Sequence, residues 1–364
     1  MIPKQMQFTI GKFDIPLTQD QPPFEIDLLD SNIILFGSAM SGKTTFIKTF
    51  VNILHKKFNE KQEQIFILDF GGALSNYKDF PLVSAYFDNS NEEYVKRLFK
   101  IAENILKDNI DNKLKNHNFR EIDEDIIHTT LIIENLNAFI DEPRYTAYQE
   151  KLSKICRDGL SKGISVVVTA SDTKGLSSYM SSFKQKIAFE LPQDKYSEIF
   201  TGKIPIIGNN PGHGFANATI KPQSAEGNFR MNLPYEVQCF LPYRVEKANN
   251  VEENKKSQTE EEFFVSLKNK FAFSDNQYTK KEKKYLTFPK ELLKTNYEML
   301  KQIPKEVKKT TLPVSVGLDY VNFEPVTIDF GKSQVVAIYG KKEFGKTNLL
   351  KLLLNGLNEQ YTEQ

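Results

Sequence analysis

Two eight-residue segments of this chain carry a spacing of glycine, lysine and hydroxyl that can surround a nucleotide phosphate. Each fits the pattern G-x-x-x-x-G-K-[ST], in which glycines let backbone N–H groups close around the phosphate, the lysine contacts the β/γ oxygens and the hydroxyl binds Mg²⁺. The pattern therefore predicts binding of ATP and Mg²⁺. The first segment consists of Gly37, Ser38, Ala39, Met40, Ser41, Gly42, Lys43 and Thr44, and the second contains Gly340, Gly345, Lys346 and Thr347.

A phosphate loop needs a strand before it and a helix after it, because the phosphate must lie at the amino terminus of the helix. An apolar run at residues 32–36 leads into the first loop, and a helical pattern at 44–58 follows it. Residues 334–339 and 347–357 repeat this order around the second loop. Few residues follow Thr347, so we expect the second module to be a truncated start of a domain.

Glu134 and Asn135 end an apolar run at residues 128–134, where a P-loop ATPase holds its metal-binding acid and its general base. With this assignment, Glu134 is the candidate catalytic acidic residue and, with Thr44, the candidate Mg²⁺ ligand. Asn135 then stands at the position of the base, and an amide cannot accept a proton. A shift by one residue makes Glu134 the base and leaves Ile133 at the metal position, which also impairs hydrolysis. Both assignments predict weak or absent hydrolysis.

Two further strand ends allow two interpretations each. Asp69 ends the apolar run at residues 64–69 and could bind metal, but a Phe-Gly-Gly turn follows it, and capping that turn is an equal alternative. Thr169 closes the run at residues 163–169 and is either a sensor of the γ-phosphate or a plain β-branched strand residue.

Composition bounds the class of protein. The 364 residues suffice for two domains, and a net charge of +1 gives no electrostatic signature for nucleic acid. Two cysteines argue against a disulfide framework, and no apolar run approaches the roughly 20 residues that a membrane helix needs. The four histidines lack metal-ligand spacing. These features favour a cytosolic protein.

Short apolar runs alternate with longer helical patterns, which is typical of an α/β fold. The runs are apolar on successive residues, as in buried parallel strands. We therefore expect a mostly parallel sheet flanked by helices. The expected strands are 32–36, 64–69, 128–134, 163–169 and 186–191, and the expected helices are 44–58, 90–116 and 145–160.

The sequence predicts three parts. Residues 1–245 form the first P-loop module, and residues 313–364 form the truncated start of a second one. Between them, 246–312 is rich in charge and reads as a largely helical connector, in which Phe263 and Phe264 suggest an apolar docking edge. A simple solvated helix is the alternative.

The chain resembles the second ATPase module of the EssC/EccC motors of type VII secretion, within the FtsK/SpoIIIE family. The resemblance spans nearly the whole chain, since Leu312 to Thr347 also resembles the start of the third module. It rests on motifs that keep their order in this sequence, at residues 10–16, 37–44, 67–72, 79–83, 131–135, 163–170 and 211–214.

The resemblance implies a RecA-like module of a membrane-anchored motor that exports small helical WXG-motif proteins. It also implies contact with other ATPase modules of the motor, a possible homo-oligomer, no nucleic-acid partner, and a location at the cytoplasmic face of the cell membrane. Membrane contact would come only through parts absent from this chain. In that family the later modules bind ATP and often lack the base, which Asn135 matches.

Three positions depart from the family pattern. Glu134 stands where aspartate is usual, His213 where arginine is usual in the Pro-Gly-x-Gly turn, and Leu160 where many members carry arginine. Arg157 remains the candidate for an arginine finger, with a surface salt bridge as the alternative.

Two other functions compete with the export motor. A DNA translocase of the same wider family would need basic loops that contact phosphates, and its affinity would fall with salt. A structural interaction module without nucleotide is the third hypothesis, and the intact first loop argues against it.

Overall fold

The computed structural model describes residues 5–16, 19–89, 92–114, 117–122, 126–201, 204–205, 210–220, 231–243, 261–266, 269, 313–318, 325–332 and 335–361. The chain divides into two compact units, residues 1–283 and 284–364, and each is described by itself. The connector expected at 246–312 lies outside the described residues, except for 261–266 and 269.

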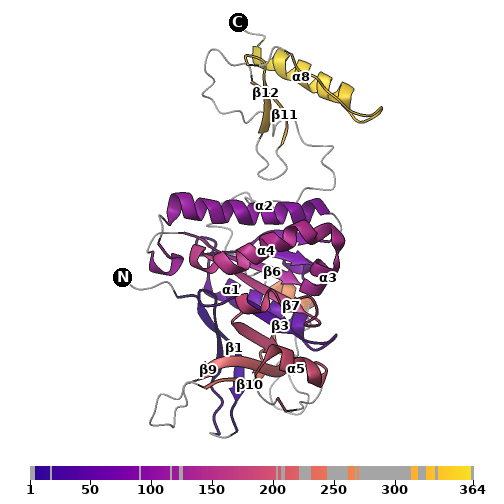
Figure 1. Cartoon of the computed structure of the whole chain (residues 1–364). Helices are drawn as coiled ribbons and strands as arrows, with labels where there is room; N and C mark the ends of the chain where they lie inside the picture. The colour runs from indigo at the N-terminus through magenta and orange to yellow at the C-terminus, as the bar shows by residue number, and fades with distance from the viewer. Residues whose placement is uncertain are drawn as a thin grey trace. The chain divides into compact units, whose positions relative to one another are not determined.

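The first unit is built on a ten-stranded sheet (Figure 1). Six neighbouring strands, from β8 to β5, are parallel, and four strands extend the sheet in antiparallel fashion. In sheet order the strands are β2 (Pro23–Asp27), β1 (Gln7–Asp14), β10 (Met231–Cys239), β9 (His213–Ile220), β8 (Gln185–Ala188), β3 (Ile33–Phe36), β7 (Ile164–Ala170), β6 (His128–Glu134), β4 (Glu63–Asp69) and β5 (Val83–Asp88).

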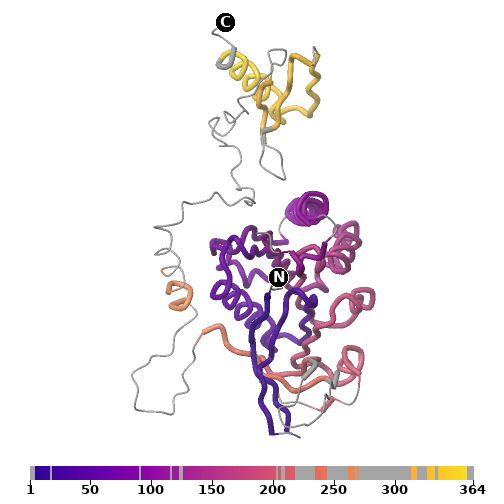
Figure 2. The backbone as a smooth tube through the Cα atoms, turned by 90° about the vertical axis from the view of Figure 1, so that its left-hand side faces the viewer, coloured from indigo at the N-terminus to yellow at the C-terminus, as the bar shows by residue number. Residues whose placement is uncertain are grey.

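Helices cover both faces of this sheet. Figure 2 shows α1, in purple, on one side and the pink helices α4 and α5 on the other. No helix among the described residues is long and apolar enough to span a membrane. The helices are α1 (Lys43–Lys57), α2 (Glu92–Asp108), α3 (Leu136–Asp141), α4 (Thr146–Asp158) and α5 (Gln193–Ile199), with short turns η1 (Ser75–Tyr77), η2 (Asn109–Lys113), η3 (Phe119–Glu121), η4 (Pro143–Tyr145), η5 (Leu160–Lys162) and η6 (Met180–Ser182).

The core explains why β3 lies in the middle of the sheet. All four residues of β3 are buried, because Ile33 and Leu35 pack with α1 residues such as Phe46 and Phe50, while the alternate side chains point to the other face. β3 is hydrogen-bonded to β7 on one side and to β8 on the other. The loop that follows it therefore starts from a rigid central position.

The predicted α/β fold with a mostly parallel sheet is confirmed. The five expected strands and three expected helices are present, and most of their ends differ by one to three residues. The helix expected at 90–116 is shorter, because α2 ends at Asp108 and only the turn η2 continues it to Lys113, and β8 already ends at Ala188. The antiparallel strands β1, β2, β9 and β10 were not predicted. β1 and β2 largely alternate buried and exposed residues, β9 contains Gly214 and Asn217, and β10 contains Pro234, so no continuous apolar run marks them.

A buried polar chain joins the amino-terminal ends of β4, β6 and β7. His128 Nδ1 lies 2.6 Å from Glu63 Oε2, and His128 Nε2 lies 2.8 Å from Ser165 Oγ. Ser165 Oγ donates to the carbonyl of Leu28, so it accepts the proton of His128 Nε2. A second proton must then lie between His128 Nδ1 and Glu63 Oε2. All three side chains are at most 1% exposed, and burial raises the pKa of the Glu63 carboxyl.

The second unit repeats the beginning of the first. β11 (Pro313–Leu318) and β12 (Pro325–Asp329) form an antiparallel hairpin, and α8 (Lys346–Tyr361) follows the second loop. The pairing shifts at Ser315/Gly317, as the pairing of β1 with β2 shifts at Thr9/Gly11. Residues 335–339, the described part of the strand expected at 334–339, do not form a strand, because no strand among the described residues of this unit pairs with them.

Candidate functional site

The first phosphate loop connects β3 to α1 and is fastened at both sides. Gly37 N–H donates to the carbonyl of Ala170, at the end of β7, over 3.1 Å. Ser38 N–H donates to the carbonyl of Glu190, just beyond β8, over 2.7 Å. The predicted loop thus has the strand–loop–helix setting that phosphate binding requires. Ala39 and Met40 form the exposed tip of the loop, and Met40 is 92% exposed.

Gly42 cannot be replaced without moving its surroundings. Its φ angle is 103°, and a Cβ atom would lie 2.6 Å from the backbone nitrogen of Gly212. Gly212 N–H in turn donates to the carbonyl of Ser41 over 2.8 Å. The turn before β9 therefore supports the phosphate loop from behind, which gives the Pro-Gly-x-Gly motif a structural role. In the first residue of β9, His213 Nε2 lies 2.6 Å from Glu236 Oε1.

Lys43 points back into the loop. Its Nζ donates to the carbonyls of Gly37 over 2.5 Å and of Ser38 over 2.8 Å. Burial lowers the pKa of the Lys43 ammonium, and the negative charge of Glu134 opposes that change. Thr44 is the next residue of α1 and is half-buried. Two backbone carbonyls thus hold the ammonium inside the loop, where the sequence pattern places a phosphate.

Glu134 is the acidic residue that faces this lysine. It ends β6 and is 8% exposed, and its Oε2 has no hydrogen-bond partner among the residues that the structure describes. Burial raises the pKa of the Glu134 carboxyl, and the neighbouring Asp69 raises it further, while Lys43 opposes both. A buried carboxylate oxygen without a partner beside a lysine is a suitable ligand for a cation.

Asp69 caps a turn, which decides between the two interpretations of this residue. Its Oδ1 accepts the N–H groups of Gly71 and Gly72, and its Oδ2 accepts that of Leu74 and the hydroxyl of Tyr86, all within 3.0 Å. Because these four donors use both oxygens, Asp69 shapes the loop after β4.

Asn135 caps a helix. Its φ angle is 65°, and its side-chain oxygen accepts the N–H of Ala138 in the first turn of α3 over 3.3 Å. Its own N–H donates to Thr169 Oγ1 over 2.8 Å. Thr169 is fully buried, so this hydroxyl ties the end of β7 to the start of α3.

Asn137 was not singled out from the sequence, although it holds the loop that follows Thr169. Its Oδ1 accepts the N–H groups of Ser171 and Asp172, and its Nδ2 donates to the carbonyls of Asp172 and Lys174. The segments after β6 and β7 therefore form one connected wall beside the phosphate loop. Asparagine is a preferred cap and turn residue, which was the available signal.

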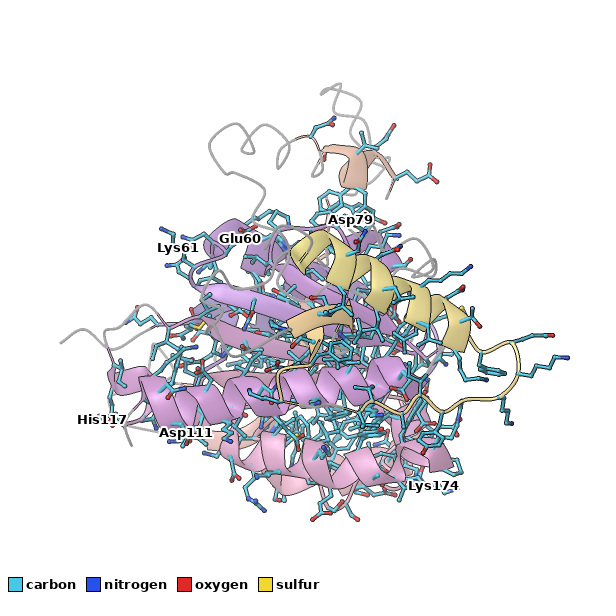
Figure 3. All side chains as sticks on the ribbon, turned by 90° about the horizontal axis from the view of Figure 1, so that it is seen from above. Glu60, Lys61, Asp79, Asp111, His117 and Lys174 are labelled. Carbon is cyan, nitrogen blue, oxygen red and sulfur yellow. The ribbon has the colours of Figure 1, made fainter. Side chains whose placement is uncertain are left out.

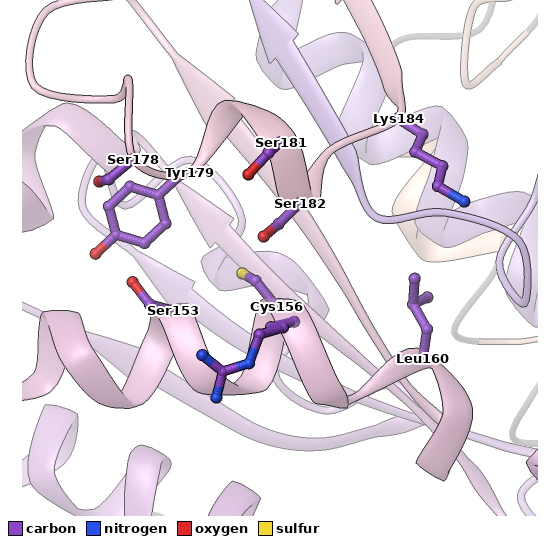
Figure 4. A pocket seen from close by; sticks show the side chains of 9 residues that line it. Ser153, Cys156, Leu160, Ser178, Tyr179, Ser181, Ser182 and Lys184 are labelled. Atoms are coloured by element: carbon purple, nitrogen blue, oxygen red, sulfur yellow. The ribbon is translucent and has the colours of Figure 1, made fainter.

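Arg157 lies near the amino-terminal ends of the parallel strands, whereas the phosphate loop follows the carboxyl-terminal end of β3. It is at the end of α4, its side chain is 70% exposed, and it pairs with Asp158 over 2.9 Å. It lines a pocket of about 430 Å³ (Figure 4). Burial raises the pKa of the Cys156 thiol in this pocket to about 12, so that thiol is not a nucleophile. The other lining residues are Ser153, Leu160, Ser178, Tyr179, Ser181, Ser182 and Lys184.

The second loop has the shape of the first without its fastening. Lys346 Nζ donates to the carbonyls of Gly340 over 2.7 Å and of Lys341 over 2.6 Å, and Gly345 has a φ angle of 81°. Thr347 follows on α8, as Thr44 follows on α1. Within the described part of the second unit, however, no strand flanks this loop, and Tyr339 before it is 91% exposed.

Comparison with known proteins identifies a family whose profile covers the first loop and the strand ends around it. The profile of the FtsK/SpoIIIE family matches residues 3–183. The type VII secretion system protein EssC of Staphylococcus aureus (strain MRSA252) is 24% identical over 357 residues, which cover 95% of this chain and 22% of that protein. The chain thus spans about a fifth of the length of this curated relative.

Two solved structures share the fold. EssC (ATPases 2 and 3) from Geobacillus thermodenitrificans has a TM-score of 0.75 at 21% identity, covering 99% of this chain and 66% of that chain. Thermomonospora curvata EccC (ATPases 2 and 3), solved in complex with a signal sequence peptide, has a TM-score of 0.59 at 18% identity, covering 98% and 61%.

Proposed function

This chain carries a domain of the FtsK/SpoIIIE family in residues 3–183, and from that premise we propose that it is an ATP-binding module of a type VII protein-secretion motor. The module binds Mg-ATP at the first loop and hydrolyses it weakly or not at all. It acts beside other ATPase modules at the cytoplasmic face of the cell membrane, and its cargo is small helical WXG-motif proteins. The P-loop fold by itself supports nucleotide binding.

One observation carries this proposal, namely the pre-shaped first loop. Its glycines, its lysine and its fastening to β7 and β8 fit a phosphate. Ser41 Oγ and Glu134 Oε2 are buried there without hydrogen-bond partners among the described residues, so both can accept new contacts. Lys43 would hold the β/γ oxygens, and Thr44 and Glu134 would hold Mg²⁺. The bound ion would supply neutralisation of the phosphate charge.

We expect one ATP per chain. The second loop has lysine and threonine in place, but a phosphate site also needs its loop held by neighbouring strands. Calorimetric titration of the whole chain with Mg-ATP should give a stoichiometry of one, and deletion of residues 313–364 should leave it at one. A stoichiometry of two that falls to one on deletion would contradict this expectation.

The competing DNA translocase predicts a different result. The net charge of +1 gives no electrostatic drive toward a duplex, and nonspecific attraction should vanish with salt. The lysine-rich run 280–284 lies outside the described residues. A duplex-binding assay at low and physiological salt separates the two functions. Micromolar binding that persists at physiological salt, with ATP-dependent movement, would favour the translocase.

A further inference from the structure

The helical turn of residues 261–266 belongs to the first unit and packs two phenylalanines against earlier residues of that unit. Phe263 and Phe264 are 7% and 6% exposed. The ring of Phe264 lies 5.1 Å from that of Tyr77 and 6.1 Å from that of Phe80, and the ring of Phe263 lies 5.6 Å from that of Tyr243. We call Tyr77, Phe80 and Tyr243 the aromatic seat. Figure 3 shows Asp79, the neighbour of Phe80, beside this short helix.

The aromatic seat is tied to the helix that carries the phosphate-binding lysine. The Tyr77 hydroxyl donates to Asn52 Oδ1 over 3.1 Å, and its oxygen lies 3.3 Å from the carbonyl oxygen of Lys48. Asn52 and Lys48 both belong to α1. The middle residues of α1 therefore contact the aromatic seat, and its first residue, Lys43, is the lysine of the phosphate loop.

A second connection runs from the seat to the acidic side of the site. Tyr77 ends η1, and the turn before η1 is capped by Asp69 through the N–H groups of Gly71, Gly72 and Leu74. A Cβ atom on Gly71 would lie 3.0 Å from Glu134 Oε2. The segment from Asp69 to Tyr77 therefore touches Glu134 at one end and Phe264 at the other.

We propose that residues 261–266 form a strap whose docking on the aromatic seat is positively coupled to nucleotide binding at the first loop. This inference rests on the proposed function, because it concerns the nucleotide of that site. The docked strap holds Tyr77 against α1 in the orientation that keeps Lys43 in the loop, so strap and nucleotide stabilise the same state. Coupling of this kind is reciprocal.

The strap is suited to reversible docking. A helical segment this short does not persist by itself in water, so its order depends on the seat. Only two rings are buried, while Val265 is 58% exposed and Glu261 and Glu262 are exposed as well. The free energy gained by burying two side chains is opposed by the conformational entropy of six residues, so docking lacks a large surplus and a ligand can shift it.

Two measurements on the whole chain test the coupling. Saturating Mg²⁺ with a non-hydrolysable ATP analogue should slow amide hydrogen exchange in residues 261–266. Phe264→Ala should weaken affinity for the same analogue about fivefold or more, the range of ordinary coupling. Val265→Ala is the matched control, because this exposed side chain lies on the same turn, and it should leave the affinity unchanged.

Tyr77→Phe separates coupling from folding, since it keeps the ring that packs on Phe264 and removes only the hydroxyl bound to α1. In this variant the strap should remain protected, and nucleotide should slow its exchange less than in the wild-type chain, because the connection through Asp69 remains. Adding Phe264→Ala to Tyr77→Phe should then lower affinity by a smaller factor than Phe264→Ala does in the wild-type chain. Unchanged affinity and exchange across Phe264→Ala and Tyr77→Phe, in a chain that binds the analogue, would overturn the coupling alone. Failure of the wild-type chain to bind it would overturn the proposed function as well.

Discussion

ATP turnover by the isolated chain should stay below about 1 s⁻¹, at or under the low end of typical enzymes. The first reason is that Asn135 stands where the resemblance places the general base, and its amide cannot accept a proton. Losing a group that positions or stabilises the reacting atoms in phosphoryl transfer costs about 10³ to 10⁵ in rate. The structure adds a second reason, because the Asn135 side chain is engaged with the N–H of Ala138 and caps α3.

Steady-state phosphate release measures this turnover. Asn135→Glu should recover activity only modestly, since the change removes a residue that tolerates a φ of 65° and loses a cap worth about 1 kcal/mol. Asn135→Asp is the matched control, because aspartate keeps the cap and directs its carboxylate toward α3, and its turnover should stay low. A wild-type turnover above about 1 s⁻¹ would refute the account of a degenerate base.

Glu63→Ala should lower the free energy of unfolding by about 3 kcal/mol. Glu63 is fully buried and hydrogen-bonded to His128, so alanine would leave the imidazole nitrogen without a partner in the core. His128 also holds Ser165, which reaches the carbonyl of Leu28, so the loss extends along the chain of bonds. Urea unfolding of the whole chain, followed by circular dichroism, measures the change.

Glu63→Gln is the control for this prediction. A glutamine amide can donate to His128 Nδ1 while His128 Nε2 donates to Ser165, so every bond survives without the extra proton. Its cost should therefore stay within about 1 kcal/mol. Equal destabilisation by alanine and glutamine would show that the hydrogen bonds among Glu63, His128 and Ser165 do not stabilise the fold. These three side chains lie at the amino-terminal ends of the strands, away from the phosphate loop, so nucleotide affinity should be unaffected in both variants.

The phosphate loop and the parallel strands could be predicted because their signals are local. The glycines and lysine of the first loop lie between Gly37 and Lys43, and the runs before and after the loop fit a strand and a helix. The same local chemistry shapes the second loop, where Lys346 closes on Gly340 as Lys43 closes on Gly37. A loop conformation is therefore encoded within eight residues, whereas its fastening to neighbouring strands is not.

Long-range features of the site could not be predicted. The support of Ser41 by Gly212 joins residues far apart in sequence, and so does the bond from Asn135 to Thr169. Asp69 shows why residue type alone was ambiguous. An aspartate at a strand end can bind a metal or cap a turn, and only the positions of the amides of Gly71, Gly72 and Leu74 select the cap.

The central claim is that the first loop binds nucleotide through Lys43, and calorimetric titration with Mg-ATP tests it most directly. Lys346→Ala is the matched control, because it removes the corresponding lysine of the second loop. We predict saturable binding by the wild-type chain and by Lys346→Ala, and no detectable binding by Lys43→Ala. Equal affinity of Lys43→Ala and the wild-type chain would contradict the account.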